Sequence, residues 1–378
     1  MQELWTPSYT ITPTVANALM AIEAAKAMVA HTPLPPTVEA RLRERARLRS
    51  THYSTYIEGN RLTLAETREA VEQRGVTFHG RERDVAEVRN YWQALLRMEE
   101  WAAKGQPLTE DLIRRLHALV EYGPRAKPTP YRDGQNAIRD SASGALVYLP
   151  PEARDVPALM AQLVRWVQQA NQTALPVPLI AALAHYQFVT VHPYYDGNGR
   201  TARLLATFLL QRGGYGLNGF FSLEEHHARD LDTYYHALAT HPHHNYYMGR
   251  AETDLTLWLE YFAGLLARVF TLAQDEALAC ASEGMPAEPD ALRRLDHRAR
   301  TVLALFARHD AITTAMVATA LGLSPRMART LVTGWVDDGW LQPATAAKKN
   351  RTYHLTALYR HFIGVISATG DADNDASR

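Results

Sequence analysis

A glycine-rich loop between two apolar, helix-length segments constrains the fold of this chain more than any other feature. The segment VPLIAALAHYQFVTV, residues 177–191, comes before the loop, and NGRTARLLATFLLQRGG, residues 198–214, follows it. Asp-Gly and Asn-Gly often form hairpin turns, but here helical segments lie on both sides. A loop that feeds a helix N-terminus leaves backbone N–H groups free, and the helix dipole adds positive potential there. The sequence therefore predicts an anion-binding loop, and the missing GxxxxGK[ST] pattern excludes a Walker A loop.

Helical periodicity over most of the chain predicts a mainly α fold. The segment LTEDLIRRLHALVEYG, for example, has a helical pattern that starts at the candidate N-cap Thr109. One region differs, because it holds Gly134, Gly144 and a short β-type run, ALVYL, that stops at Pro150. We expect this region to form a small β-hairpin, or flap, beside the helical core.

Composition divides the chain into expected domains. We expect residues 1–100 to form an N-terminal helical module and residues 101–275 to form the core that contains the glycine-rich loop. The proline-rich and glycine-containing segment ACASEGMPAEPD predicts a linker over residues 276–292. Residues 293–363 contain three helix-sized segments and then two short strands around a basic turn, an order that resembles a winged helix-turn-helix domain. The polar tail, residues 364–378, is expected to be disordered.

Charge and cysteine content narrow the class of protein. Lys plus Arg count 40, as do Asp plus Glu, so no overall charge draws the chain to nucleic acid or to a membrane. Residues 293–360 differ, because nine Arg and two Lys against four Asp give them a formal charge of +7. The single cysteine, Cys280, excludes an internal disulfide and suits a reducing compartment. The chain has no secretory-signal pattern and no run of about 18 uncharged apolar residues, so we expect a cytoplasmic protein without a membrane partner.

The side chains in and after the loop complete the requirements of a phosphate site. His192 can titrate near neutrality, as a general base must. Asp196 offers the hard oxygen atoms that Mg²⁺ shares with phosphates. Asn198 can donate to a phosphate oxygen, and Arg200 and Arg203 lie three residues apart on one helix face. Both guanidinium groups can fork onto phosphate oxygens.

The run HPYYDGNGRTAR resembles the signature of the Fic-domain proteins, His-Pro-Phe-x-Asp/Glu-Gly-Asn-Gly-Arg-x-x-Arg. Tyr194 stands where the family usually has Phe. Since the family aromatic packs beneath the loop, we expect Tyr194 to serve if its hydroxyl finds a partner. The segments ALAHYQFVTV, LLATFLLQRGGY and YLPP also fit the family, and the N-terminal segment resembles the helical module that precedes many Fic cores. The resemblance covers nearly the whole chain.

The resemblance implies a nucleotidyltransferase that moves AMP from ATP to a Ser, Thr or Tyr hydroxyl of a target protein. His192 would take the hydroxyl proton, and Asp196 would hold Mg²⁺ between the α- and β-phosphates. The backbone from Gly197 to Gly199, with Asn198, would cradle the phosphates. Two arginines, Arg200 and Arg203, would fix the β- and γ-phosphates.

Two further regions receive roles from the same resemblance. The flap at Val147, Tyr148 and Leu149 would hold the target segment by adding it as a strand. Tyr234 and Tyr235 would lie near the nucleobase, and the alternative for both is a place among the core aromatics. A homodimer fits the family, while the identity of the target is not encoded in a flap that binds through its backbone.

The stretch STYIEGN places a glutamate, Glu58, in the last turn of a predicted helix, where the helix dipole disfavours an anion. An isolated glutamate is usually a solvated surface acid. Ser54-x-x-x-Glu58-Gly59, however, resembles the inhibitory (S/T)xxxE(G/N) motif that precedes some Fic cores. The resemblance implies that Glu58 pairs with Arg203, takes the place of the γ-phosphate and leaves ATP in an unproductive pose, with Ser54 holding the helix.

Four alternatives stay open. The chain could be a DNA-binding regulator through residues 293–360, with Arg326 and Arg329 on a recognition helix and Lys348, Lys349 and Arg351 on the wing. A winged helix that binds protein or forms a dimer explains the same residues. Some Fic proteins instead remove AMP from modified targets. The histidines in EEHHARD and HPHHNYY suggest a metal site, against which solvated or hydrogen-bonded histidines are the simpler interpretation.

Overall fold

The computed structural model describes residues 5–73, 75–139, 143–282, 295, 297–307, 309–344, 351–356 and 359. The chain divides into two compact units, Met1–Glu283 and Gly284–Arg378, which are described separately. The predicted N-terminal module and the predicted core therefore belong to one unit rather than two. The helix that ends this unit continues to Ser282, so the first residues of the predicted linker are helical.

The first unit is mainly helical, as the periodicity predicted. Its helices are α1 (Pro13–His31), α2 (Pro36–Ile57), α3 (Leu64–Glu72), α4 (Glu82–Ala103), α5 (Glu110–Tyr122), α6 (Val156–Ala170), α7 (Val177–Val191), α8 (Asn198–Arg212), α9 (Leu223–Arg229), α10 (Leu231–Leu238) and α11 (Thr256–Ser282), with short 3₁₀ turns η1 (Leu217–Gly219) and η2 (Arg250–Glu252). The predicted hairpin is present as strands β1 (Ile138–Arg139) and β2 (Leu146–Tyr148), which pair antiparallel.

Local sequence explains where the helices begin and end. The Thr109 hydroxyl accepts a hydrogen bond from the Leu112 N–H at 3.1 Å, so the predicted N-cap of α5 is confirmed. At the other end, Gly123 takes a φ of 84°, which glycine adopts at little cost. At α3, the Thr63 hydroxyl and the Glu66 carboxylate exchange hydrogen bonds with each other's backbone N–H in a capping box.

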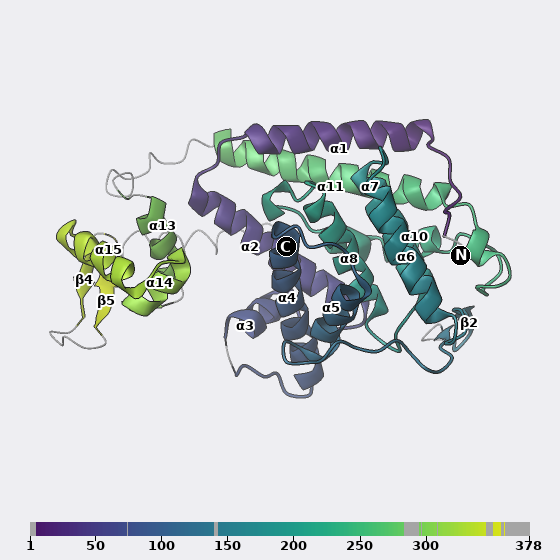
Figure 1. Ribbon diagram of the computed structural model, residues 1–378, viewed down its shortest axis with the longest axis horizontal. Coiled ribbons are helices and arrows are strands. Elements are labelled where there is room, and N and C mark those ends of the chain that lie inside the picture. The colour runs from purple at the N-terminus through teal and green to yellow at the C-terminus, as the bar shows by residue number, and fades with distance from the viewer. Residues whose placement is uncertain are drawn as a thin grey trace, which may run out of the picture. The chain divides into compact units, whose positions relative to one another are not determined.

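The two helices that flank the glycine-rich loop form the centre of the first unit. α7 is apolar on every face and almost wholly buried, as expected of a helix surrounded by other elements. α8 packs against α7 and contributes Leu204, Leu205 and Phe208 to the same core. Helices α4, α5, α6 and α11 surround this pair, and α1 lies along α11 (Figure 1). The loop between α7 and α8 is therefore fixed at both ends by the best-packed part of the unit.

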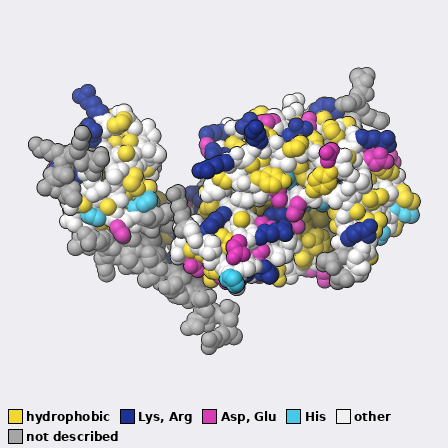
Figure 2. All heavy atoms as spheres, turned by 90° about the horizontal axis from the view of Figure 1, so that it is seen from below, with side chains coloured by type: hydrophobic (Ala, Val, Ile, Leu, Met, Phe, Trp, Pro, Cys, Tyr) yellow, Lys and Arg dark blue, Asp and Glu magenta, His cyan; other side chains and the backbone are white. Residues whose placement is uncertain are grey.

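Helix α11 is long and apolar enough to cross a membrane by length and composition alone. Half of the residues in that apolar window are buried. They include Trp258, Phe262 and Phe270, which belong to the main hydrophobic core. The apolar character of α11 is thus used for packing inside the unit. On the face shown in Figure 2, acidic and basic side chains are interspersed with apolar ones.

The second unit has a hydrophobic core of its own. Its elements are α13 (His297–Leu303), η3 (Ala304–Ala307), β3 (Ile312–Thr313), α14 (Thr314–Leu321), α15 (Pro325–Asp337), β4 (Leu341–Pro343) and β5 (Thr352–Leu355). The strands form an antiparallel sheet in the order β3-β5-β4. Three helical segments and a terminal hairpin appear in the predicted order, and the name winged helix stays a prediction.

Two of the five predicted DNA-contacting residues, Arg326 and Arg329, are exposed on α15. Arg351 lies at the start of β5, while Lys348, Lys349 and the tail predicted to be disordered lie outside the described residues. DNA binding by this unit stays a prediction.

Candidate functional site

The loop between α7 and α8 is held in shape by hydrogen bonds within the motif. The Asn198 side chain accepts from the Tyr194 N–H at 3.0 Å and donates to the Tyr194 carbonyl at 2.8 Å. Gly197 precedes α8 with a φ of 72°, which favours glycine. Asn198 is buried, and its side chain closes the loop from within. Its contact with a phosphate, and the cradle formed with the backbone from Gly197 to Gly199, stay predictions.

His192 lies at the end of α7 in a left-handed backbone conformation, with φ 49° and ψ 61°. For a non-glycine residue this conformation costs about 1–2 kcal/mol. The ring nitrogen Nδ1 lies 3.2 Å from the Val189 carbonyl, so Nδ1 carries the proton and Nε2 is left as the acceptor. Burial lowers the pKa of His192 to about 4, and the imidazole is therefore neutral at pH 7.

Arg203 is fully inside the site and is held by the α2 helix. Its Nε donates to the Ser54 hydroxyl at 2.9 Å, and its Nη2 donates to the Ser54 carbonyl and to Glu58 Oε1, both at 2.8 Å. Although burial opposes the charged guanidinium, the Glu58 carboxylate beside it raises the pKa of Arg203. The structure therefore brings together the three residues that the STYIEGN motif and the loop motif predicted.

The Glu58 carboxylate lies directly over the N-terminus of α8. A Cβ atom placed on Gly199 would be 2.3 Å from Glu58 Oε1, so only glycine leaves room for the carboxylate. Glu58 is thus at the C-terminus of its own helix but at the N-terminus of another. The dipole and the free N–H groups of α8 stabilise an anion there.

Helix α2 is fixed along its length as well as at Glu58. The buried Ser50 hydroxyl donates to the buried Glu224 carboxylate at 2.8 Å. Arg47 pairs with Glu99 of α4 at 2.6 Å, and Arg49 pairs with a carboxylate of α9 at 3.1 Å. The predicted inhibitory helix is therefore an integral element of the unit.

Arg200 has a glutamate partner that the sequence did not predict. Its Nη2 lies 2.8 Å from Glu121 Oε1, at the end of α5, and 3.4 Å from Asp196 Oδ1. The Arg200 side chain is buried. A Cβ atom on Gly197 would be 2.3 Å from Glu121 Oε1, so this carboxylate also lies against a loop glycine. Burial is the main reason that the pKa of Glu121 is raised.

Asp196 has the exposure and the chemistry of a metal ligand. Its side chain is 60% exposed, and its Oδ1 accepts the Gly197 N–H at 2.7 Å. Arg83 Nη2 lies 3.7 Å from Oδ2, so this oxygen has only a distant, exposed partner. Within the described ranges no group of three His, Cys, Asp or Glu could hold a metal ion. Mg²⁺ at Asp196 stays a prediction, and such an ion would take its other ligands from phosphates and water.

Tyr194 packs beneath the loop, as predicted for the family aromatic. Its ring stacks on the His117 ring with centroids 3.6 Å apart. The His117 Nε2 in turn lies 2.9 Å from the Asp196 carbonyl, so this stack supports the loop from below. The Tyr194 hydroxyl is buried without a hydrogen-bond partner in the described structure, so the partner on which the substitution depended is missing.

The flap residues differ from one another in what they offer a target. Val147 is exposed and is free to meet another chain. Tyr148 is buried, and its hydroxyl donates to the Thr190 carbonyl at 2.8 Å, so its side chain anchors the flap. The Leu149 N–H donates to the His244 carbonyl at 2.7 Å, so its backbone is already paired. Strand addition by a target therefore concerns β2 before Leu149.

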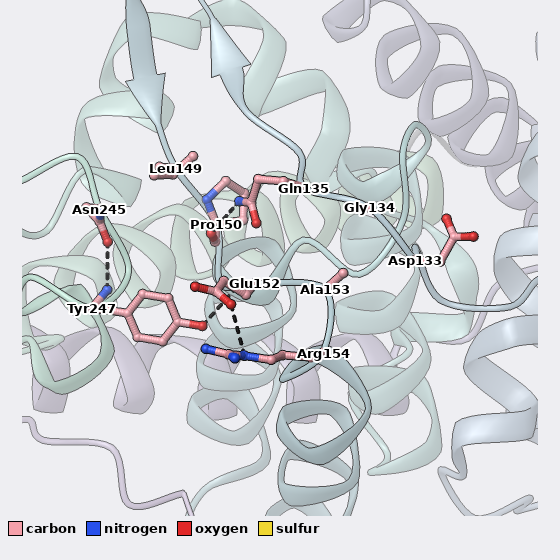
Figure 3. Close-up of a pocket in the computed structure, with 10 residues that line it drawn as sticks. All are labelled: Asp133, Gly134, Gln135, Leu149, Pro150, Glu152, Ala153, Arg154, Asn245 and Tyr247. Atoms are coloured by element: carbon pink, nitrogen blue, oxygen red, sulfur yellow. Dashed lines mark hydrogen bonds and ion pairs between the residues drawn. The ribbon is translucent and has the colours of Figure 1, made fainter.

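A hollow of about 530 Å³ lies beside the base of the flap (Figure 3). Leu149 and Pro150 form one side of it, and the Tyr247 ring points toward Glu152 and Arg154 on the other. The Arg154 Nε lies 2.9 Å from the Glu152 carboxylate. None of the residues of the loop between α7 and α8 lines this hollow.

The two tyrosines predicted near the nucleobase differ in burial. Tyr234 is fully buried, and its hydroxyl lies 3.0 Å from His185 Nε2 within a cluster of aromatic rings. It therefore takes the alternative role of a core aromatic. Tyr235 is 48% exposed, and its pKa is raised, first by partial burial and then by the charge of Glu58. Tyr235 stays the candidate for contact with the nucleobase.

Two of the histidines that suggested a metal site have other partners. His227 Nδ1 lies 2.8 Å from the Tyr261 hydroxyl in the interior. His241 Nδ1 accepts the backbone N–H of His243 at 3.1 Å.

Three residues of the site were not predicted from the sequence: Glu121, His117 and Arg132. Arg132 is buried at the start of the hairpin and donates from Nε to the His192 carbonyl at 2.9 Å. Glu121 had a signal, because it is an acid in the last turn of a helix, as Glu58 is. His117 and Arg132 depend on contacts between distant segments, which the sequence pattern does not reveal.

Comparison with known proteins agrees with this geometry. Residues 107–210 match the family model of the Fic/DOC family. Over 176 residues, 46% of this chain, the sequence is 32% identical to the protein adenylyltransferase Fic of Drosophila melanogaster, and equally to that of Drosophila sechellia. The chain spans about a third, 34%, of the length of these curated relatives.

Solved structures show the same fold. A Fic family protein from Desulfovibrio desulfuricans G20 superposes with a TM-score of 0.58 at 25% identity, over 93% of this chain and 99% of its own. A Fic domain containing signaling protein from Bacteroides thetaiotaomicron VPI-5482 gives a TM-score of 0.58 at 25% identity, over 70% of this chain and 97% of its own.

Proposed function

We propose that this chain, which is a Fic-domain protein, transfers AMP from ATP to a hydroxyl group of a target protein. The observation that carries the proposal is the joint placement of a neutral His192 and two buried arginines at the N-terminus of one helix, α8. A base, an anion-binding helix end and guanidinium groups are what phosphoryl-type transfer requires.

His192 would act as the general base. The hydroxyl oxygen of the target attacks the α-phosphorus of ATP, the bond from that phosphorus to pyrophosphate breaks, and the hydroxyl proton passes to Nε2 of His192. The Nδ1 contact with the Val189 carbonyl, at 3.2 Å, leaves Nε2 unprotonated for this purpose. A base with a pKa near 4 is fully available at neutral pH, although its low basicity limits the driving force for proton transfer.

The N-terminus of α8 would hold the phosphates. The backbone N–H groups after Gly197 face the anion, and the helix dipole supports it. Asp196 would hold Mg²⁺, which would neutralise charge between the α- and β-phosphates. Arg203 would bind the terminal phosphates once Glu58 has left it, and Arg200 has N–H groups beyond the Nη2 that faces Glu121.

The enzyme would be autoinhibited by Glu58. The Glu58 carboxylate occupies the position over Gly199 and Arg203 that a terminal phosphate needs. ATP would then bind with its phosphates displaced, and the α-phosphorus would not lie in line with the target hydroxyl. Since 31% of the Glu58 side chain is exposed, it can move into solvent without a movement of α2.

Labelling with α-³²P-ATP and Mg²⁺ tests this function. We expect a Glu58→Gly protein to label itself or lysate proteins with AMP, and the added change His192→Ala to abolish the label while ATP binding survives. Retained labelling in the double variant would show that His192 is not the base. Absence of any label with the Glu58→Gly protein and host lysate would contradict AMP transfer itself.

A further inference from the structure

Arg132 is a buried cation without an anion, and this sets it apart from the other arginines of the site. Its residue surface is 3% exposed. No carboxylate pairs with it in the part of the chain that the structure describes, and its neighbour Asp133 instead accepts the Tyr195 hydroxyl at 2.7 Å. Burial lowers the pKa of Arg132, which reflects the cost of keeping this charge out of water. A buried charge without an ion-pair partner needs hydrogen bonds from its surroundings, and the acceptors of Arg132 are backbone carbonyls.

The Arg132 guanidinium donates hydrogen bonds to three backbone carbonyls, one in the loop after α7 and one on each side of the hairpin. Nε donates to the His192 carbonyl at 2.9 Å, and Nη1 donates to the Gly134 carbonyl at 3.0 Å. Nη2 donates to the Pro151 carbonyl, directly after the flap. The Arg132 N–H also donates to the Pro193 carbonyl at 2.9 Å. One side chain thus connects the catalytic loop to both ends of the flap.

The contact with His192 supports a strained residue. A left-handed conformation turns the His192 carbonyl away from the α7 helix, so that this carbonyl needs a partner from outside. Arg132 supplies it, and a cation near a helix C-terminus also complements the dipole of α7. The Val189 carbonyl holds the other side of the residue through Nδ1. The contact of the His192 carbonyl with Arg132 and the contact of Nδ1 with Val189 together fix the direction in which Nε2 points.

We infer that Arg132 is a positioning residue that sets the orientation of His192 and couples it to the flap on which the target lies. The inference rests on the proposed function for its activity readout, but the geometry is independent of it. The same guanidinium binds both the loop that carries His192 and the foot of the flap. The general base and the incoming hydroxyl are therefore held in fixed positions relative to each other. Misplacement by about 1 Å costs on the order of 100-fold in rate.

The first test compares AMP transfer by Glu58→Gly with that by Glu58→Gly carrying Arg132→Lys. Lysine keeps the charge but cannot reach three carbonyls in a fork. We expect kcat to fall about 100-fold with little change in the KM for ATP. Arg125→Met, which removes an exposed arginine upstream on the same segment, is the matched control and should transfer at the parent rate. An unchanged kcat in the Arg132→Lys protein would overturn the inference.

The second test needs no turnover and therefore separates this inference from the proposed function. The His192 imidazole is followed by NMR against pH, its signal identified by its loss in His192→Ala. Glu58, Asp196 and Arg132 are the charged groups that face it. Removing the positive charge in Arg132→Met should raise the pKa of His192, whereas Arg132→Lys should leave it near its original value.

Hydrogen exchange completes the second test. Both Arg132 variants should speed amide exchange in residues 143–151, because the flap base loses its anchor, and the Arg125→Met control should not. An arginine that only stabilised the fold would lower the unfolding midpoint without selectively speeding amide exchange in the flap. If Arg132→Met leaves both the titration and the flap exchange unchanged in a folded protein, the inference is wrong.

Discussion

Two arginines near the start of α8 each pair with a glutamate, and the two glutamates differ in their surroundings. Arg203 pairs with Glu58 from α2, and Arg200 pairs with Glu121 from α5, each at 2.8 Å. Each glutamate also lies against one glycine of the loop, Glu58 over Gly199 and Glu121 against Gly197. The molecule thus places a carboxylate on each side of the helix N-terminus.

The difference lies in exposure and in what remains when the glutamate is removed. The Glu58 side chain is 31% exposed and Glu121 is 14% exposed. Without Glu58, Arg203 still has the carbonyl and hydroxyl of Ser54. Without Glu121, the buried Arg200 keeps only a 3.4 Å contact with Asp196. The same ion pair therefore suits a switch in one place and a structural counter-ion in the other.

The largest expected effect is on activity at Glu58. We expect Glu58→Gly to increase AMP self-labelling by roughly 10–100-fold, because a charged hydrogen bond worth about 1.5–3 kcal/mol no longer competes with the phosphate. The measurement is the initial rate of labelling with α-³²P-ATP. Glu58→Gln, which keeps the shape and removes the charge, should give an intermediate rate. If a folded Glu58→Gly protein shows no increase in the labelling rate, Glu58 is not a switch.

A change at Glu121 should affect stability more than activity, the reverse of what we expect at Glu58. We expect Glu121→Gln to lower the free energy of unfolding by about 2–3 kcal/mol, less than a fully broken buried pair because Asp196 takes up part of the interaction. Urea unfolding measures this. Glu100→Gln, which removes only exposed pairs with Arg97 and Lys104, is the control and should change stability little. A rise in labelling to the level of the Glu58→Gly protein would instead make Glu121 a second inhibitory residue.

The smallest expected effect is at Ser54. Its hydroxyl accepts from Arg203 Nε at 2.9 Å and so fixes the guanidinium opposite Glu58. Since the Ser54 carbonyl still holds Nη2, Ser54→Ala should raise self-labelling only about 2–10-fold, in line with one hydrogen bond of about 0.5–1.5 kcal/mol. Thr55→Val is the matched control, because the Thr55 hydroxyl bonds only to carbonyls of its own helix. An equal increase in both variants would assign the effect to a loosened helix.

Comparison of the two glutamates also shows what could be read from the sequence. The loop and its flanking helices could be predicted from helical period and turn residues, whereas the pair of Glu58 with Arg203 was implied by the resemblance of STYIEGN and HPYYDGNGRTAR to Fic-family motifs. Glu121 carries the same local signal, an acid in the last turn of a helix before a glycine, yet LHALVEYG gives no indication of which helix end lies opposite. Arg132 had no signal, since its partners are backbone carbonyls.

Side-chain direction was the other point that the sequence left open. Tyr148 and Val147 are neighbours on β2, and alternation sends one side chain into the core and the other outward. The pattern ALVYL predicted the strand but did not fix which face is buried. Tyr234 and Tyr235 separate for a similar reason, because adjacent positions on a helix point in different directions.

The attachment of α2 to the core has a consequence for how an active form can be made. Ser50 donates to Glu224, and Arg47 pairs with Glu99, so a protease cut or an engineered deletion that removed α2 would open the interior to water. Trimming the chain from its N-terminus is therefore no route to a constitutively active protein. Under the proposed function, activation requires the Glu58 carboxylate to leave Arg203 while α2 stays packed in place.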